Sequence, residues 1–574
     1  MLNGADRLGR RPFVFFVFAS TAGLLLCFWT LILPSSRRII SPARISPAVC
    51  KHLPSAIPCD RGQEKPVIQP SDDQHPIIIP SNARAKAVKD AFASAFNLYW
   101  VSCRGRDEIM PRTGKCRDTR NQWGASAVDA LSTAIIMKQE EIVEQILEFI
   151  PAIDFNHTEQ QVSLFETTIR YLGGLLAGYD LLTGPFQHIT NNKTSTEALL
   201  TQSKTLADAL RFAFDTPTGI PHNDLWINQT WVDMDTNGLA TTGTLVLEWA
   251  RLSDLLGDPY YGELAFVSVS KFLQISVDSL SRRFKGESYL IDAKPSYNVP
   301  FPGLPGTRIN IDDGLFVDAR GGWNGGDDSY YEYLIKMYVY DPVRFASYRD
   351  AWIQAADSSI KYLATHPSTK PDITFLAGYD NHTLTPVGTH LGCFAGGNFL
   401  LGGQVLDRPD YVEFGLQLTS GCHETYIGTA TGIGPEVFSW NITELEESQK
   451  SYYDEHGFWI SNAGYQLRPE VIESYYYAYR ITGDKKYQDW AWDAFVAINR
   501  TCRAEYGFAS IDDVNDPHGG KKLDFQESFM FAEVLKYSYL IQADDGPFQV
   551  NYKGRNEFVY NTEAHPLRVA RRSQ

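Results

Sequence analysis

The sequence predicts an all-α fold in which pairs of helices close into a ring, an α/α toroid. Apolar residues recur at spacings of three and four in the stretch 164–185, LFETTIRYLGGLLAGYDLLTGP, and that period marks one face of a helix. Similar stretches begin at 243, 327, 467 and 525 and end in Gly, Asp or Pro, often before a second helical segment. Clear strand alternation is scarce. Helical hairpins that bury their faces against neighbours favour a closed ring over a four-helix bundle.

The bulk composition indicates one large domain and excludes some partners. The chain has 574 residues, a net charge of −16 and 13% aromatic residues. The negative charge disfavours a polyanion, so we expect no nucleic acid partner. No stretch after residue 85 has the composition of a linker. We therefore predict a single catalytic domain over 86–568, a basic tail over 569–574, and a monomer.

The first 85 residues predict a membrane anchor. An uncharged run, FVFFVFASTAGLLLCFWTLIL, covers 13–33 and is long enough to span a bilayer. Arg7, Arg10 and Arg11 precede it, which predicts a cytosolic tail over 1–12 and a lumenal remainder, although Arg37 and Arg38 weaken that orientation. The alternative is a cleaved signal peptide, which would make the protein secreted. Pro- and Ser-rich residues 34–85 predict a lumenal stem.

Sequons and cysteines indicate the secretory pathway. The chain has six N-x-[ST] sites, at Asn156, Asn192, Asn228, Asn381, Asn441 and Asn499. Cys27 lies in the apolar run, and the other seven cysteines are odd in number, so at least one is free or pairs with another chain. Cys50 with Cys59, and Cys103 with Cys116, are candidate local pairs, and Cys502 has no assigned role. We expect a type II membrane protein of the Golgi or endoplasmic reticulum with a lumenal catalytic domain.

Several predicted helices carry an acid near their start. These acids are Glu166, Asp328, Glu332, Glu470, Glu473, Glu527 and Glu533. An acid in a first turn complements the helix dipole, and that explains any single one of them. In a ring, however, like helix ends gather at one rim, so the acids are expected to converge on one pocket. Clustered carboxylates then hold protons or a cation. One protonated acid and one carboxylate are what glycosidic bond hydrolysis needs.

Three other segments are weaker signals. In VYNTEAHPL (559–567), Thr562 offers hydroxyl and carbonyl oxygens suited to Ca²⁺, with a surface turn as the alternative. His390 in GTHLGCFAGG is either a structural histidine or part of a site wall. The Gly-rich GGWNGGDDS lacks the lysine and spacing of a phosphate loop, so we expect no nucleotide site.

Together these segments resemble class I α-1,2-mannosidases, glycoside hydrolase family 47. The residues of WGASAVDALSTA are most similar to those of fungal members. The resemblance rests on WGASAVDAL, FETTIRYLGGLLAGYDL, DDSYYEYLIK, HLGCF, GIGPE, LRPEVIES, YRITGDKKYQDWAW, ESFMFAEVLKYSYL and NTEAHPL, in that order over 123–567. It implies an (α/α)₇ barrel and a Ca²⁺-dependent, inverting hydrolase. The implied substrate is terminal α-1,2-linked mannose on high-mannose N-glycans.

The resemblance also implies roles for individual residues. Glu166 matches the proposed general acid, thought to act through a water, and Asp328 matches a second essential acid; which of them is the proton donor stays open. Glu470 matches the base that activates water, and Glu436 a further acid lining the site. Thr562 matches the residue that binds Ca²⁺ directly, the other ligands being waters and sugar hydroxyls.

Further residues follow from the same resemblance. Those expected to bind the sugar or hold the Ca²⁺ waters are Arg170, His390, Arg468, Glu473, Glu527 and Glu563. Cys393 and Cys422 match the family's disulfide.

Two positions depart from the family pattern. Ser132 stands where many members have Asp, and we expect a structural effect only. Gly326 stands where endoplasmic-reticulum members carry an Arg that limits trimming to one branch, so we predict broader, Golgi-type trimming. The alternative function is a lectin-like, degradation-enhancing relative that binds mannose glycans with little hydrolysis. A different α/α-toroid glycosidase is a further alternative, which NTEAHP argues against.

Overall fold

The computed structural model describes residues 80–570, except 228, 232–233, 273–298 and 552–554. The predicted cytosolic tail, the apolar run 13–33 and the stem up to 79 therefore lie outside the described residues. So do Cys27, Cys50, Cys59 and Asn228. Among the residues that are described, no helix is long and apolar enough to cross a membrane.

The boundaries of the catalytic domain are wider than predicted. Helix α1 begins at Ser81, within the segment predicted as stem. At the other end, the backbone N–H groups of Val569 and Ala570 donate to the carbonyls of Glu557 and Tyr340. These first two residues of the predicted basic tail are therefore part of the folded domain, and the rest of that tail lies outside the described residues.

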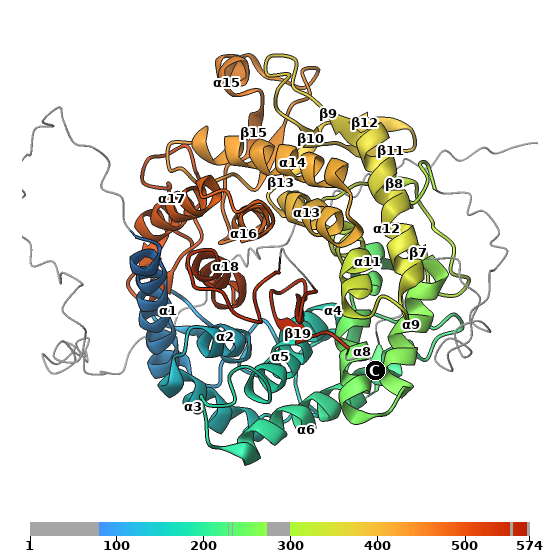
Figure 1. Cartoon of the computed structure of the whole chain (residues 1–574), viewed down its shortest axis with the longest axis vertical. Coiled ribbons are helices and arrows are strands. Elements are labelled where there is room, and N and C mark those ends of the chain that lie inside the picture. Colours follow the sequence, from blue (N-terminus) through green and yellow to red (C-terminus); the bar gives the residue numbers. More distant parts are fainter. Residues whose placement is uncertain (1–79, 228, 232–233, 273–298, 552–554, 571–574) are drawn as a thin grey trace, which may run out of the picture. The chain divides into compact units, whose positions relative to one another are not determined.

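The described helices form two concentric rings (Figure 1). The inner ring consists of α2 (Ala125–Ile136), α5 (Gly173–Leu182), α8 (Val246–Leu256), α11 (Asp328–Tyr340), α13 (Phe394–Leu406), α16 (Glu470–Thr482) and α18 (Leu535–Leu540). The outer ring consists of α1 (Ser81–Cys103), α3 (Glu140–Phe149), α6 (Lys193–Leu210), α9 (Tyr260–Phe272), α12 (Ala346–Ser358), α14 (Pro409–Ile427) and α17 (Lys486–Thr501). Each inner helix packs on an outer one, and successive inner helices contact each other.

The ring closes through the last inner helix, which starts as the π-helical turn η8 (Met530–Val534) and continues as α18. It contacts α16 on one side and α2 on the other, while α1 covers it from outside. This confirms the predicted toroid and the (α/α)₇ arrangement that the resemblance implies.

Short elements connect the helices. The short helices are α4 (Leu164–Thr167), η2 (Ile150–Ala152), η3 (Thr168–Leu172), η4 (Arg211–Phe214), α7 (Leu239–Gly243), η5 (Ser359–Leu363), η6 (Leu391–Cys393), η7 (Glu447–Gln449) and α15 (Lys450–His456). The strands are β1 (Glu108–Ile109), β2 (Cys116–Arg117), β3 (Val162–Ser163), β4 (Asp224–Trp226), β5 (Thr230–Trp231), β6 (Thr236–Gly238), β7 (Arg308–Asn310), β8 (Arg320–Gly321), β9 (Ala364–Thr365), β10 (Phe375–Leu376), β11 (Gly378–Asp380), β12 (Thr383–Thr385), β13 (Val387–Thr389), β14 (Val437–Ser439), β15 (Trp459–Asn462), β16 (Arg503–Ala504), β17 (Gly507–Phe508), β18 (Phe558–Tyr560) and β19 (Pro566–Arg568). Their pairings are antiparallel, for example Val559 opposite Leu567.

Close packing around α13 depends on glycine. A Cβ at Gly402 would lie 2.1 Å from the ring of Trp352 on α12, and one at Gly396 would lie 2.5 Å from Thr419 Oγ1 on α14. Both distances are too short for real atoms, so α13 approaches its neighbours only because these positions lack a side chain.

The tyrosines of α16 belong to the barrel wall. Tyr475, Tyr476 and Tyr477 are at most 2% exposed. The ring of Tyr476 packs against those of Tyr537, in a tilted arrangement, and Tyr560, edge to face, at centroid distances of 5.5 and 6.2 Å. Their burial explains why this helix carries so much aromatic surface next to acids at its start.

The hairpin of β18 and β19, the last two strands of the chain, lies inside the ring (Figure 1). β19 contacts α5, and β18 contacts α11. The side-chain oxygen of Asn561 accepts from the N–H groups of Glu563 and His565 at 3.0 and 2.7 Å, and its Nδ2 donates to Glu248 at 2.7 Å. These buried bonds fix the turn that carries Thr562 in the middle of the barrel.

Cysteine pairing follows both the local and the family-based expectations. Cys103 is bonded to Cys116, and Cys393 to Cys422. Cys502 is a buried free thiol, which burial renders unreactive by raising its pKa to about 12. Of the described sequons, Asn156 and Asn381 are exposed, and Asn192, Asn441 and Asn499 are half-buried.

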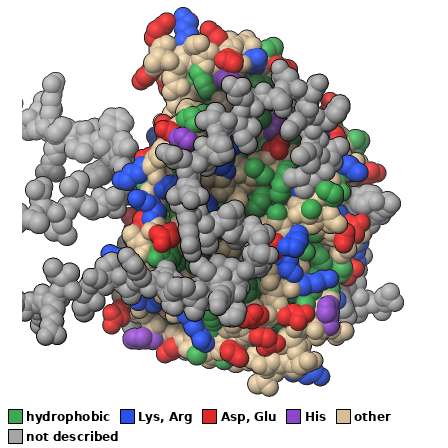
Figure 2. All heavy atoms as spheres, turned by 90° about the vertical axis from the view of Figure 1, so that its left-hand side faces the viewer, with side chains coloured by type: hydrophobic (Ala, Val, Ile, Leu, Met, Phe, Trp, Pro, Cys, Tyr) green, Lys and Arg blue, Asp and Glu red, His purple; other side chains and the backbone are tan. Residues whose placement is uncertain are grey.

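The described surface mixes both signs of charge. On the face shown in Figure 2, acidic and basic side chains are interspersed.

Candidate active site

One cavity collects nearly all the predicted site residues. It has a volume of about 360 Å³. The predicted residues on its wall are Glu166, Arg170, Asp328, Arg468, Glu470, Glu473, Glu527, Thr562 and Glu563. The acids Glu332 and Glu533 and the apolar Phe165, Leu391, Phe394 and Phe529 complete much of the lining. The expectation that helix-end acids converge on one pocket is confirmed.

Helix starts place the main acids. Asp328 is the first residue of α11 and Glu470 the first of α16. Glu166 lies in α4, where the Ser163 hydroxyl caps the helix by accepting from the Glu166 N–H. Because inner helices share a direction around the ring, these three starts face the same space.

Arg170 organises one wall of the cavity. Its Nε donates to Glu166 Oε2 at 2.8 Å, and its Nη1 donates to Glu563 Oε1. Asp129 lies 3.6 Å from the same nitrogen. Arg170 sits in the π-helical turn η3, an irregularity that is frequent at functional sites because it redirects a side chain.

Glu166 and Asp328 have opposite protonation tendencies. Burial disfavours ionisation of Glu166, but the charges of Arg170 and Arg120 outweigh it and lower the Glu166 pKa. Burial, reinforced by the nearby acids Glu332 and Glu470, raises the pKa of Asp328 to about 7. Near neutrality Glu166 is therefore ionised, whereas Asp328 holds a proton for part of the time.

Glu470 is held as a carboxylate. Its Oε2 lies 2.7 Å from His390 Nδ1. Burial opposes its charge, but the bond from His390 and the charge of Arg468 outweigh burial and lower the Glu470 pKa. An ionised carboxylate at the cavity wall is able to accept a proton from water.

Two predicted site residues contact residues that line the cavity but do not line it themselves. His390 contacts Glu470 from the protein side, and Glu436 accepts from Arg468 Nε at 2.6 Å and from the Gln466 N–H at 2.8 Å. Neither is among the residues that line the cavity. Glu436 is therefore bound to a residue of the cavity wall, Arg468, and its role in the site stays a prediction.

The cavity floor is the hairpin turn with Thr562. His565, three residues further on, is completely buried and lies 2.9 Å from Ser132 Oγ and 3.2 Å from Asp129 Oδ1. Lys536 Nζ donates to the carbonyl of Ala564 at 2.5 Å. Ser132 thus helps to hold the segment that presents Thr562.

Arg120 is a cavity residue that the sequence reasoning missed. Its guanidinium lies 3.7 Å from Glu166 Oε2 and 3.9 Å from Glu527 Oε2. The backbone of Arg120 is fixed at both ends: its N–H donates to Asp107 Oδ2 at 2.8 Å, and its carbonyl accepts from the Tyr171 hydroxyl at 2.6 Å. No local pattern reveals these contacts, because they join segments far apart in the chain.

Comparisons with known proteins agree with this geometry. Residues 91–569 match the profile described as Glycosyl hydrolase family 47. The chain is 53% identical over 518 residues to the mannosyl-oligosaccharide alpha-1,2-mannosidase 1B of Aspergillus phoenicis, covering 90% of this chain and 96% of that protein. It is 54% identical over 492 residues to the mannosyl-oligosaccharide alpha-1,2-mannosidase of Penicillium citrinum, covering 86% and 93%.

A solved structure shows the same arrangement. The alpha-1,2-mannosidase from Trichoderma reesei superposes with a TM-score of 0.81 at 45% identity, covering 86% of this chain and 100% of that one.

Proposed function

The chain belongs to glycosyl hydrolase family 47, and from that premise we propose that it is a Ca²⁺-dependent, inverting exo-α-1,2-mannosidase. Its substrate is terminal α-1,2-linked mannose on high-mannose N-glycans. The observation that carries the chemistry is one cavity that holds an ionised carboxylate, Glu470, and a carboxyl that keeps a proton near neutrality, Asp328.

The reaction follows from these two groups. Glu470 accepts a proton from a water molecule, and the water oxygen forms a bond to the anomeric carbon. The bond from that carbon to the glycosidic oxygen breaks, and we assign the proton that the leaving oxygen receives to Asp328. Glu166, which is ionised and paired with Arg170, then holds water or sugar hydroxyls. Attack from the face opposite the leaving group inverts the anomeric configuration.

The cavity fits a calcium ion. Its floor carries the hydroxyl and carbonyl oxygens of Thr562, which are hard ligands. Burial and neighbouring acids raise the pKa of Glu473 to about 8 and raise that of Glu533 well above its usual value, so a cation would relieve clustered negative charge. Among the described residues no three His, Cys, Asp or Glu side chains converge on a metal position. Thr562 would hold the ion directly, waters held by the acids would complete its ligands, and the bound ion would supply positive charge beside the sugar hydroxyls.

Removal of Ca²⁺ by EDTA is expected to reduce mannose release from α-1,2-mannobiose to background, and added Ca²⁺ to restore it. Ca²⁺ is also expected to raise the melting temperature, because a ligand at 100 times its Kd stabilises the folded state by about 2.7 kcal/mol. Thr562→Val, which keeps the shape but loses the hydroxyl, should weaken that shift. Full release in EDTA would contradict Ca²⁺ dependence, and glycan binding without any release would favour the lectin-like alternative.

We propose that the protein removes several mannoses rather than one. Gly326 lies on the cavity wall, and a Cβ there would meet only Thr307 Cγ2, at 3.5 Å. The absence of a side chain at this position widens the cavity on the side of Asp328.

The purified lumenal domain is therefore expected to trim a nine-mannose glycan by several residues. Gly326→Arg should make the digestion stall early, because a long cation would fill this part of the cavity. The matched control is Gly326→Ala, since it carries the same backbone strain at a φ of +102° without the cation. Stalling of the unmodified enzyme after one mannose would contradict the proposal.

We also propose that the protein works in the secretory pathway as a monomer anchored by residues 13–33. The sequons support passage through the secretory pathway, and the disulfides Cys103–Cys116 and Cys393–Cys422 support an oxidising compartment.

A further inference from the structure

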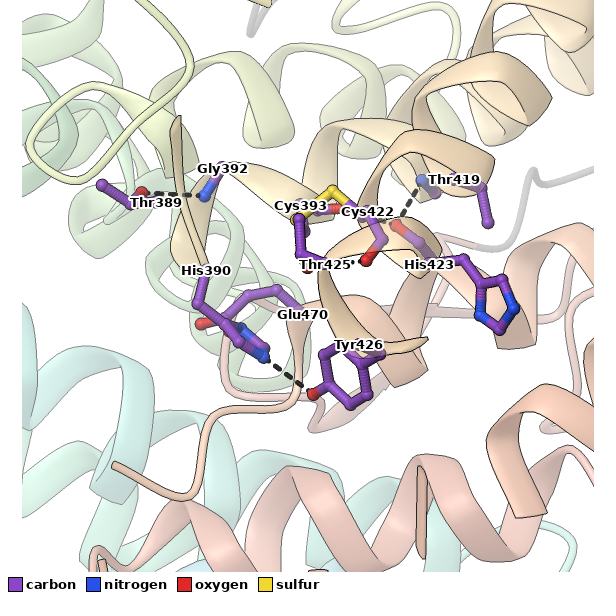
Figure 3. The surroundings of a disulfide bond; sticks show 12 residues. Thr389, His390, Gly392, Cys393, Thr419, Cys422, His423, Thr425, Tyr426 and Glu470 are labelled. Atoms are coloured by element: carbon purple, nitrogen blue, oxygen red, sulfur yellow. Dashed lines mark hydrogen bonds and ion pairs between the residues drawn. A yellow bond between two sulfur atoms is a disulfide. The ribbon is translucent and has the colours of Figure 1, made fainter. Parts of the chain in front are cut away.

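A hydrogen-bonded chain joins the proposed base, Glu470, to His390 and Tyr426 (Figure 3). Glu470 Oε2 lies 2.7 Å from His390 Nδ1, and His390 Nε2 lies 2.8 Å from the Tyr426 hydroxyl. His390 and Tyr426 are 2% and 3% exposed. Both bonds are therefore shielded from water, and neither residue lines the cavity.

For a neutral imidazole, the donors in this chain have a definite direction. A carboxylate only accepts, so Nδ1 of His390 donates to Glu470. A neutral imidazole that donates from Nδ1 accepts at Nε2, and Tyr426 donates to it. Burial raises the pKa of Tyr426 well above its usual value, so its hydroxyl keeps the proton that this bond requires. Tyr426 thereby fixes the tautomer of His390.

The disulfide Cys393–Cys422 ties together the two segments that carry this bond. Cys393 ends the turn that follows His390, and its N–H donates to the His390 carbonyl at 3.0 Å. Cys422 lies on α14, one helical turn before Tyr426. Each end of the His390–Tyr426 bond is thus within one turn of a covalent link (Figure 3).

We propose that Tyr426, clamped by the Cys393–Cys422 disulfide, is a positioning residue that orients His390 against Glu470. This rests on the proposed role of Glu470 as base. Because His390 occupies Oε2, the other oxygen, Oε1, is left to take the proton from water. If the carboxylate of Glu470 rotated, His390 would no longer be bound to one oxygen while the other was left for water.

Other charges also face Glu470, and a test must separate them from Tyr426. They come from the segment before α16, from α16 itself, from α11 and from η8, and are Arg468, Glu473, Asp328 and Glu533. A change at Tyr426 leaves all of them in place.

Tyr426→Phe is the direct test. It removes one hydroxyl, so kcat on α-1,2-mannobiose is expected to fall by about 5- to 10-fold, the equivalent of one hydrogen bond, with KM within about twofold. Without the Tyr426 donor, Nδ1 of His390 donates less strongly, and the pKa of Glu470 rises. The acidic limb of the kcat–pH profile is therefore expected to move to higher pH.

The chain offers a matched control in Tyr475→Phe. The Tyr475 hydroxyl on α16 lies 2.8 Å from His423 Nδ1 on α14, and His423 stacks on Trp490 at 3.6 Å. This second Tyr–His pair ends in aromatic packing instead of at the base. Its loss should lower the melting temperature about as much as the loss of the Tyr426 hydroxyl, but should not move the acidic limb.

Removal of the disulfide provides an independent test of the same inference. The double variant Cys393→Ala, Cys422→Ala is expected to move the acidic limb in the same direction as Tyr426→Phe. An acidic limb that is unchanged in Tyr426→Phe, or equally displaced in Tyr475→Phe, would overturn the inference. Failure of the base assignment is distinguishable, because Glu470→Gln would then keep its activity.

Discussion

Glu470→Gln is expected to abolish mannose release while leaving the fold intact. The amide matches the carboxylate in shape and still accepts from His390, but it has no charge with which to take a proton from water. General base catalysis contributes about 10²- to 10⁴-fold, so kcat on α-1,2-mannobiose should fall by that factor. The measurement is single-turnover and steady-state mannose release at saturating Ca²⁺.

Binding separates a lost base from a lost site. The variant should bind the disaccharide within a few-fold of the unmodified enzyme, because the other cavity residues are unchanged. Its melting temperature should not fall, since a buried charge is removed and the bond to His390 is kept. Full activity of Glu470→Gln would refute the assignment.

Helical periodicity predicted much of the fold, and acids at helix starts predicted part of the site. Asp328 and Glu470 follow the rule that acids occupy first turns, and ring closure brings those turns to one cavity. Thr562 has no such local signal, and only its motif NTEAHP points to it. Its position depends on the β18–β19 hairpin, which contacts the inner helices α5 and α11.

The sequence did not predict Arg120 as a cavity residue, because its position depends on long-range contacts. Arg120 enters the cavity because Asp107 accepts from four backbone N–H groups, those of Arg120, Gln122, Gly124 and Ala125. Asn121 and Gln122 take positive φ values of 77° and 63° in that loop, which only the surrounding bonds stabilise. Such a conformation cannot be inferred from residue types alone.

Asp328→Asn is expected to lower kcat as strongly as loss of the base, by about 10²- to 10⁴-fold, but with a different dependence on the substrate. An amide cannot give a proton to the glycosidic oxygen. An α-mannosyl fluoride needs no such proton, because fluoride leaves unaided. The Asp328→Asn variant should therefore hydrolyse the fluoride at a rate close to that of the unmodified enzyme, whereas Glu470→Gln should be slow on both substrates.

The dependence of activity on pH provides a second, independent test of which acid donates the proton. The pKa of Asp328 is raised to about 7, so the fraction that holds a proton falls as the pH rises through that value. Activity on the disaccharide should accordingly decline on the alkaline side near pH 7, and Asp328→Asn should lose that decline. Glu166 has a lowered pKa and is already ionised there, so Glu166→Gln should keep the alkaline limb.

These outcomes decide between the two candidate donors. If Asp328 gives the proton, the fluoride rescues Asp328→Asn and not Glu166→Gln. The reverse pattern would assign the proton to a water held by Glu166, and Asp328 would then act by its charge alone. Burial favours the first result, because within the described part of the chain no cation pairs with Asp328 as closely as Arg170 pairs with Glu166, at 2.8 Å. A carboxyl in that setting is the one that keeps a proton to give.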